Sequence, residues 1–406
     1  MACSPSLHMA ILPWFATRHI SSFLQLSNNL AERGHSISLF IPKHTHAIFQ
    51  HLNQHPSLIS LIPICVPHND HHGLPHVAEA TSEVPSSTVS LLMTPMVLYE
   101  KDIEVHLLEL KPNIVLFDHA YWVPKPRLTR CLGIKSLVYY VISPSSLTCE
   151  LSYLYPSGIS EGYYCNITEH HHLLHEPKLL AGSGRVDHGK GIVCIERCTN
   201  STLTQSYATG LKGCRVIEGA YVDYHRRHVS LQEHVIIPKE TTCHSEKNWA
   251  NWLGNFGTGS VAYCSIGSEC TLKPCQFQEL LLGLELSGMP FVASLRPPKG
   301  FECVESALPK GFKERVQGRG VVSGGSVPHQ FILEHPSVGC FVTVCGYSGS
   351  LSEALVNKCQ LVLLPNHGEG VFNARVIGNT LKVGVEVEKL KTIKMVCLPK
   401  KVCAKL

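Results

Sequence analysis

A histidine and an aspartate, each placed directly after a predicted strand, are the side chains of this sequence best suited to moving a proton. His19 follows the apolar run 9–14 and opens a helical pattern near Ile20, and Asp118 follows the run 114–117. Carboxyl ends of parallel strands meet at one sheet edge, where α/β folds bind ligands. A carboxylate fixes the tautomer of an imidazole, and a helix N-terminus favours the neutral base. Spacing alone leaves two interpretations, a catalytic dyad or a surface or capping histidine among the chain's 25.

Other chemistries have weaker support in the sequence. There is neither a Gly-x-Ser-x-Gly elbow nor a P-loop, and the glycine-rich stretch 254–260 precedes a strand, which is the wrong order for a dinucleotide fingerprint. The histidine-rich segments 68–72 and 169–175 are candidate zinc ligands. They lack the His-Glu-x-x-His pattern and lie in loop-like sequence, so solvated polar loops are the simpler interpretation. Cys340 and Cys345 fall in or beside an apolar strand, where thiols usually pack.

The elements that must position these residues follow the order of an α/β protein. The first forty residues form a strand, a helical pattern to Arg33, Gly34 where a helix C′ glycine belongs, and a strand at 36–41. A parallel pair joined by a helix is the unit of an α/β sheet. Further strands are predicted at 114–117, 136–142, 260–266, 291–295, 338–344 and 360–364, with helices at 276–287 and 351–356.

The length of 406 residues suggests two domains. The polar stretch 239–247 after Pro238 places the boundary between 225 and 250, and we divide the chain into 1–235 and 236–406. Residues 151–250 show little periodicity, and a strand-length piece is missing before Cys214. The Lys-rich segment 389–406 has no convincing helical face.

Composition excludes several classes of protein. With 44% hydrophobic residues and 16% charged residues, the chain is not disordered. Its net charge of +4 is too small for a nucleic-acid or membrane-surface binder. No apolar run approaches the roughly 18–20 residues of a membrane span, and no secretory signal is recognisable. We therefore expect a cytoplasmic protein whose 18 cysteines are reduced.

The segment 326–370 is the most specific feature of the sequence. It contains HPSVGCFV at 335–342, then Cys345-Gly346, Ser350 and Glu353, and LVLLP at 361–365 with Glu369. It resembles the donor-binding signature of plant UDP-dependent glycosyltransferases. Other parts that resemble this family are PWFA at 13–16 with His19, FDHAYWVP at 117–124, and the pieces at 252–253, 259–261, 267–269, 276–280 and 311–312. The resemblance spans most of residues 8–148 and 249–388, and within the family it is greatest to the branch that adds a sugar to flavonoid glycosides.

The resemblance implies a GT-B fold of two facing Rossmann-like domains, the first for the acceptor and the second for the nucleotide sugar. His19 then matches the base that deprotonates the acceptor hydroxyl, and Asp118 the carboxylate that orients it. UDP leaves with inversion in one step. Neither a metal nor another cofactor is implied, the UDP-sugar is a co-substrate, and a monomer is expected. Glu353 matches the ribose-binding carboxylate, Ser268 and Ser350 match diphosphate contacts, and Glu369 a sugar contact; Val327, Cys345 and Gly346 also fall in the donor site.

Several positions depart from the family pattern. Ser326 replaces the tryptophan that stacks on uracil, Val344 replaces the histidine that donates to the phosphates, and Gly370 replaces a sugar-binding glutamine. Another glutamine of the pattern is displaced, with Pro328 and His329 in its neighbourhood. There is also one extra residue between Tyr347 and Ser350, and the family's closing helices are not recognisable after about residue 388, as in a truncated chain. Two hypotheses follow, an active glycosyltransferase or a relative that keeps the fold but binds donor poorly.

Overall fold

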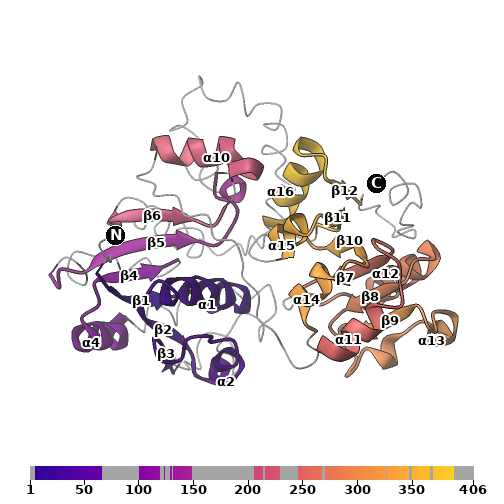
Figure 1. Ribbon diagram of the computed structural model, residues 1–406, viewed down its shortest axis with the longest axis horizontal. Coiled ribbons are helices and arrows are strands. Elements are labelled where there is room, and N and C mark those ends of the chain that lie inside the picture. Colours follow the sequence, from indigo (N-terminus) through magenta and orange to yellow (C-terminus); the bar gives the residue numbers. More distant parts are fainter. Residues whose placement is uncertain are drawn as a thin grey trace. The chain divides into compact units, whose positions relative to one another are not determined.

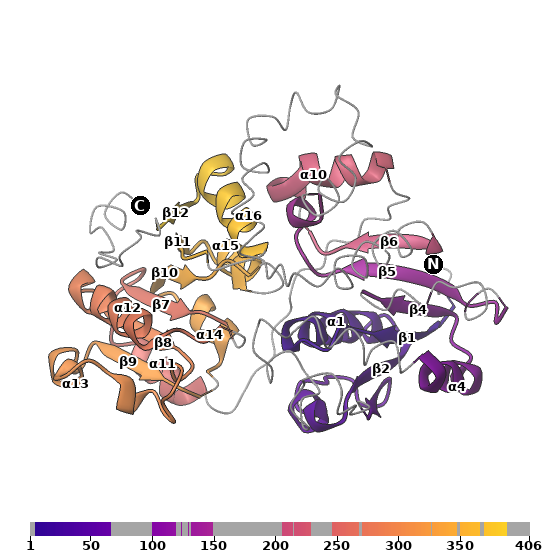
Figure 2. The same cartoon turned by 180° about the vertical axis from the view of Figure 1, so that it is seen from behind.

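A computed structural model describes residues 5–65, 100–118, 123, 129, 131–148, 205–213, 215–228, 246–267, 270–325, 327–346, 350–365 and 369–387. The chain divides into two compact units, Met1–Pro238 and Lys239–Leu406. Figure 1 shows a parallel sheet with flanking helices in each unit, and Figure 2 shows the same elements from behind. Among the described residues, no helix is long and apolar enough to cross a membrane.

The first unit contains a parallel six-stranded sheet in the order β3-β2-β1-β4-β5-β6. The strands are β1 His8–Leu12, β2 Ser36–Pro42, β3 Ile59–Ile64, β4 Ile114–Phe117, β5 Lys135–Tyr140 and β6 Ala208–Leu211. The chain reverses its direction of travel across the sheet between β1 and β4, as in a doubly wound fold. Leu12 pairs with Phe117, so the residues that follow these two strands emerge side by side.

Both faces of this sheet are buried, as parallel sheets require. Along β1, Ala10 and Leu12 belong to one apolar cluster, while Met9 and Ile11 belong to the other. The helix α1 (Thr17–Ala31) covers the second face with Ile20, Phe23 and Leu24, and α4 (Glu100–Leu110) covers the first with Ile103 and Leu107. The short elements η1 (Lys43–Thr45) and α2 (His46–Gln50) follow β2, and α10 (Arg215–His228) follows β6.

The helix α1 ends at Ala31 with Glu32 as its C-cap, two residues earlier than expected, and Gly34, predicted at the C′ site, lies one position beyond it. Gly34 has a φ of +84°, a left-handed conformation that a glycine adopts without strain, and its N–H bonds to the Ala31 carbonyl. The chain then enters β2 at Ser36. The tight turn brings the chain back to the edge of the sheet where β2 begins parallel to β1.

The second unit repeats the same topology. Its parallel sheet has the order β12-β11-β10-β7-β8-β9, so the reversal lies between β7 and β10. The strands are β7 Val261–Ser265, β8 Phe291–Ser294, β9 Gly320–Ser323, β10 Val338–Thr343, β11 Gln360–Leu363 and β12 Gly384–Glu386. The helices are α11 Glu246–Leu253, α12 Pro274–Ser287, α13 Phe312–Arg315, α14 His329–Glu334, α15 Ser352–Val356 and α16 Glu369–Arg375, with η7 Glu305–Ala307 and η9 Val376–Thr380.

The predicted strands are all present, within one or two residues of the expected bounds. One prediction is wrong: the strand that the sequence analysis finds missing before Cys214 is present as β6, which pairs with β5 through Ala208 and its neighbours. Its sequence, ATGL, is too short and too poor in branched residues to be recognised by pattern. The histidine-rich segments at 68–72 and 169–175, and the chain after residue 387, lie outside the described residues.

Candidate active site

His19 lies in the first turn of α1, at the carboxyl edge of the first sheet. The helix begins at Thr17, two residues before His19, and not near Ile20 as expected. Ala16 caps the helix without a side-chain hydrogen bond, and its carbonyl accepts the N–H of His19 at 2.9 Å. The His19 side chain is 3% exposed. Trp14, Phe15 and Ala16 in the turn before α1 pack into the core, and the buried imidazole of His19 therefore lies at the sheet edge.

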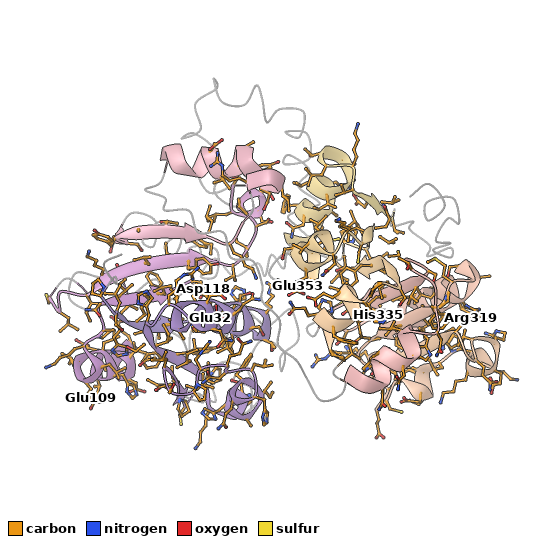
Figure 3. All side chains as sticks on the ribbon, viewed as in Figure 1. Glu32, Glu109, Asp118, Arg319, His335 and Glu353 are labelled. Atoms are coloured by element: carbon orange, nitrogen blue, oxygen red, sulfur yellow. The ribbon has the colours of Figure 1, made fainter. Side chains whose placement is uncertain are left out.

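Asp118 lies beside His19, at the carboxyl end of β4. Its Oδ2 atom lies 2.5 Å from Nδ1 of His19, and its Oδ1 atom accepts the backbone N–H of Trp14 at 2.6 Å. The aspartate is 2% exposed. Because a carboxylate is an acceptor, it selects the imidazole tautomer with a proton on Nδ1, and the lone pair of Nε2 becomes the basic site of the ring. The dyad predicted from strand spacing is thus brought together, and Figure 3 labels Asp118 at this position.

Further buried polar side chains of the first unit were not foreseen from sequence. Nζ of Lys212 lies 3.2 Å from Oγ of Ser22, which is one helical turn after His19 on α1. Glu218, where α10 is kinked, accepts the N–H and the hydroxyl of Ser145 at 3.2 and 2.7 Å. Lys212 is only 6% exposed and Glu218 only 2%. The one sequence signal for Lys212 and Glu218 is a charged residue among apolar neighbours. That signal is weak here because residues 151–250 show little periodicity.

The second unit places its predicted donor residues at the equivalent sheet edge. Val344 and Cys345 follow β10, and Gly267 follows the neighbouring strand β7. Cys345 has a left-handed φ of 66°, and its carbonyl accepts a 2.9 Å hydrogen bond from the amide of Asn373 on α16. Since Cys345 and Asn373 are both buried, this bond ties the loop after β10 to α16. Sequence reasoning missed Asn373.

The side chains of Glu353 and His329 are in contact in the second unit. Glu353, the second residue of α15, has its Oε2 atom 3.3 Å from Nε2 of His329, the first residue of α14. Nδ1 of the same ring lies 2.7 Å from the hydroxyl of Tyr263 on β7. The side chains of His329 and Glu353 are 29% and 16% exposed. The carboxylate of Glu353, the predicted ribose-binding group, is therefore partly accessible to a ligand and contacts the His329 ring.

Two of the departures from the family pattern have a structural explanation. Val344 is partly buried and packs against the apolar core of the second unit. Gly370 has no room for a side chain, since a Cβ atom there would lie 2.5 Å from the carbonyl oxygen of Val344. A side chain larger than glycine would have to move the loop after β10.

A local change of helix type occurs at the start of α15, just after the position of the extra residue in the sequence. Residues 350 and 351 are π-helical, and α-helical geometry begins only at Ser352. A π-turn absorbs one additional residue within a helix, and such turns often occur at functional sites. Glu353 therefore lies in the first turn of α15.

Not every predicted site residue can be placed. Three of these residues are described: Val327 lies just before α14, Gly346 follows β10, and Ser350 lies just before α15. Ser268 and Ser326 lie outside the described residues, and Glu369 is described as the first residue of α16 but not in its side chain. For these residues the predicted roles stay predictions.

The described thiols are free, and the described part of the chain holds no cluster of three or more His, Cys, Asp or Glu side chains that could bind a metal. Cys340 and Cys345 are buried, as expected for packing thiols. Burial raises the pKa of Cys264 to about 12 and that of Cys359 to about 11. These thiols stay protonated and are poor nucleophiles.

Two doubly wound parallel sheets, one in each unit, are the architecture of a GT-B type fold, and the first carries a buried His–Asp pair at its reversal point. No family model matches the sequence. The chain is 47% identical to a cyanidin 3-O-galactoside 2''-O-xylosyltransferase of Actinidia chinensis var. chinensis, covering 95% of this chain and 86% of that protein. It is 43% identical to an anthocyanidin 3-O-glucoside 2''-O-glucosyltransferase of Ipomoea purpurea, covering 94% and 84%. The chain belongs to the plant UDP-glycosyltransferases, and it is a glycosyltransferase enzyme.

Solved structures agree on the fold. Glycyrrhiza uralensis UGT73P12, complexed with glycyrrhetinic acid 3-O-monoglucuronide, gives a TM-score of 0.77 at 19% identity, covering 99% of this chain and 86% of that chain. A UDP-glucose: anthocyanidin 3-O-glucosyltransferase in complex with UDP gives 0.75 at 24% identity, covering 95% and 86%.

Proposed function

We propose that this enzyme transfers a hexose or pentose from a UDP-sugar to a hydroxyl of a flavonoid glycoside, with His19 as the general base. The observation that carries the proposal is the buried His19–Asp118 pair at the carboxyl edge of the first sheet. Two relatives are a cyanidin 3-O-galactoside 2''-O-xylosyltransferase and an anthocyanidin 3-O-glucoside 2''-O-glucosyltransferase, and their activities support this class of acceptor. We therefore propose the sugar of a 3-O-glycoside as the site of attack.

The proposed reaction is a single displacement. Nε2 of His19 accepts the proton of the acceptor hydroxyl as its oxygen attacks the anomeric carbon of the donor. The bond from that carbon to the UDP oxygen breaks, and its electron pair leaves with UDP. Asp118 keeps the proton on Nδ1 and stabilises the imidazolium that forms. Attack opposite the leaving group inverts the anomeric configuration.

The second unit supplies the proposed donor site. Glu353 binds the ribose hydroxyls, Ser350 and Ser268 contact the diphosphate, and Glu369 contacts the sugar hydroxyls. Val327, Cys345 and Gly346 shape the pocket, and the left-handed turn at Cys345 orients the loop after β10. Neither a metal nor another cofactor takes part in the proposed reaction.

A second candidate function is a relative that keeps the fold but binds donor poorly. Two observations favour it. Val344 has an apolar side chain where the family has a histidine that donates a hydrogen bond to the phosphates, and Gly370 has no room for the family's glutamine. Removing one donor to a developing charge can cost on the order of 10²-fold in rate.

The experiment that separates these functions has two measurements. Cyanidin 3-O-glucoside and cyanidin 3-O-galactoside are incubated with UDP-glucose or UDP-xylose, and products are identified by mass spectrometry and by the anomeric coupling in NMR. Calorimetry measures binding of UDP and UDP-glucose to the same preparation. A disaccharide product with inverted configuration, absent for His19→Ala, supports the first function. A folded protein that makes no product and does not bind UDP would overturn it.

A further inference from the structure

Three side chains from three elements of the second unit form a connected polar row. Tyr263 is on β7, His329 begins α14 and Glu353 is on α15. The Tyr263 hydroxyl lies 2.7 Å from Nδ1 of His329, and Nε2 of His329 lies 3.3 Å from Oε2 of Glu353. Tyr263 is fully buried, whereas the Glu353 side chain is 16% exposed. The row therefore connects the core of the sheet to a carboxylate that a ligand can reach.

The imidazole in the middle of the row is held on several sides. Its centroid lies 5.3 Å from the ring of Tyr263 and 5.6 Å from the ring of Phe341 on β10. Aromatic neighbours at these distances and a hydrogen bond at Nδ1 leave the ring little rotational freedom. A glutamate side chain has three rotatable bonds, and contact with such a fixed ring restricts the orientations of its carboxylate.

The hydrogen-bond directions in the row follow from the chemistry of its members. Burial, with the nearby Glu353 charge as a minor contribution, raises the pKa of Tyr263 above its ordinary value, so the phenol keeps its proton. The phenol can then donate to Nδ1, which places the imidazole proton on Nε2. Nε2 has no hydrogen-bond partner among the described residues, so its 3.3 Å contact with the Glu353 carboxylate is electrostatic. Among the residues that the structure describes, the charged or titratable groups of neighbouring elements that contact His329 are Tyr263 and Glu353.

We infer that His329 is a positioning residue that holds Glu353 in the orientation needed to accept hydrogen bonds from the ribose hydroxyls of the uridine nucleotide. This inference rests on the proposed function, which gives Glu353 its ribose contact. In the sequence, His329 lies in the neighbourhood of a displaced glutamine of the family pattern. A glutamine at 329 could donate its amide N–H to Glu353 and accept from Tyr263 through its carbonyl, and these are the two side chains that His329 contacts.

The test compares two ligands by calorimetry, UDP and 2′,3′-dideoxy-UDP, which differ only in the ribose hydroxyls. The variants are His329→Ala, His329→Gln, Tyr263→Phe and Glu353→Gln, with the double variant of His329→Ala and Glu353→Gln. The matched control is His335→Gln, at the other end of α14, whose ring bonds the Ser337 hydroxyl at 2.8 Å. Circular dichroism and a melting curve establish that each variant is folded.

Loss of the 3.3 Å contact with the carboxylate is expected to weaken UDP binding by about 10-fold in His329→Ala, the order of magnitude of one polar interaction with a charged group. Binding of 2′,3′-dideoxy-UDP is expected to be unchanged. His329→Gln should stay within about 3-fold of the parent, because both contacts are retained. In the Glu353→Gln background, His329→Ala should have no further effect, since coupled residues are not additive.

Three results would overturn the inference. His329→Ala could leave UDP binding unchanged, it could weaken both ligands equally, or it could have its full effect without Glu353. If His329→Ala does not fold, Tyr263→Phe decides the question, because a freed ring should weaken UDP selectively by about 3-fold. If the parent chain binds UDP more tightly than 2′,3′-dideoxy-UDP and the variants do not change this preference, only this inference is contradicted. A folded parent chain that does not bind UDP contradicts the proposed function as well.

Discussion

His19 and Asp118 lie 99 residues apart in sequence, and a hydrogen bond of 2.5 Å joins Nδ1 of the first to Oδ2 of the second. The other oxygen of Asp118 accepts the backbone N–H of Trp14, in the turn that leads from β1 into α1. One carboxylate thus fixes both the imidazole and the loop that carries it. Since these groups are buried, the geometry is set before any acceptor binds.

Asp118→Asn is expected to abolish most activity while leaving the fold intact. The asparagine carbonyl can still accept from Trp14, but its NH₂ group would donate to Nδ1 and move the imidazole proton to Nε2. The basic site would then be lost, and kcat should fall on the order of 10³-fold. Initial rates with UDP-glucose and cyanidin 3-O-glucoside measure this effect. UDP affinity by calorimetry is the control, and a variant with more than about a tenth of parental activity would show that the tautomer is unimportant.

The dyad could be predicted from the sequence because both residues follow buried strands of the same sheet. Strong apolar runs at 9–14 and 114–117 fix those strands, and parallel topology brings their ends together. The contacts of Lys212 with Ser22 and of His329 with Glu353 could not be predicted, since they depend on side chains from elements without distinctive periodicity. The steric limit at Gly370 is also invisible in sequence, because it is set by a carbonyl oxygen of a distant loop.

Substitution of Gly370 by the family's glutamine is expected to destabilise the second unit and not to repair the donor site. Even Gly370→Ala would place Cβ 2.5 Å from the backbone oxygen of Val344. Relief of that contact requires backbone movement, which typically costs about 1–3 kcal/mol. Urea unfolding should therefore show a lower free energy of unfolding for both variants. Gly257→Ala is the control, since no atom lies within 4 Å of its added Cβ, and equal stabilities of the Gly257 and Gly370 variants would contradict the steric argument.

Val344→His is expected to tighten UDP binding by about 10-fold, because an imidazole N–H supplies a hydrogen bond to a charged phosphate. Val344 follows β10, next to the left-handed turn at Cys345. Calorimetry with uridine, which lacks the diphosphate, is the ligand control and should show no change. Val344→Leu is the matched variant, since it keeps apolar packing against the core without a donor. A gain for uridine as large as that for UDP would indicate a general change of the pocket.

Alkylation with iodoacetamide at pH 8 is expected to separate the described cysteines by burial. Cys275 and Cys303 are exposed and should be modified within minutes, whereas the buried Cys264 and Cys359 should stay unmodified in peptide mass spectra. Their pKa values of about 12 and about 11 keep both thiols protonated at this pH.

An unfolded thiol titrates near 8.5, so the folded chain retains the protons of Cys264 and Cys359 at pH values where the unfolded chain loses them. The free energy of unfolding should therefore fall as the pH rises above about 8.5, and labelling of Cys264 should increase together with unfolding. Rapid labelling of Cys264 in a folded protein at pH 8 would contradict its burial in the sheet.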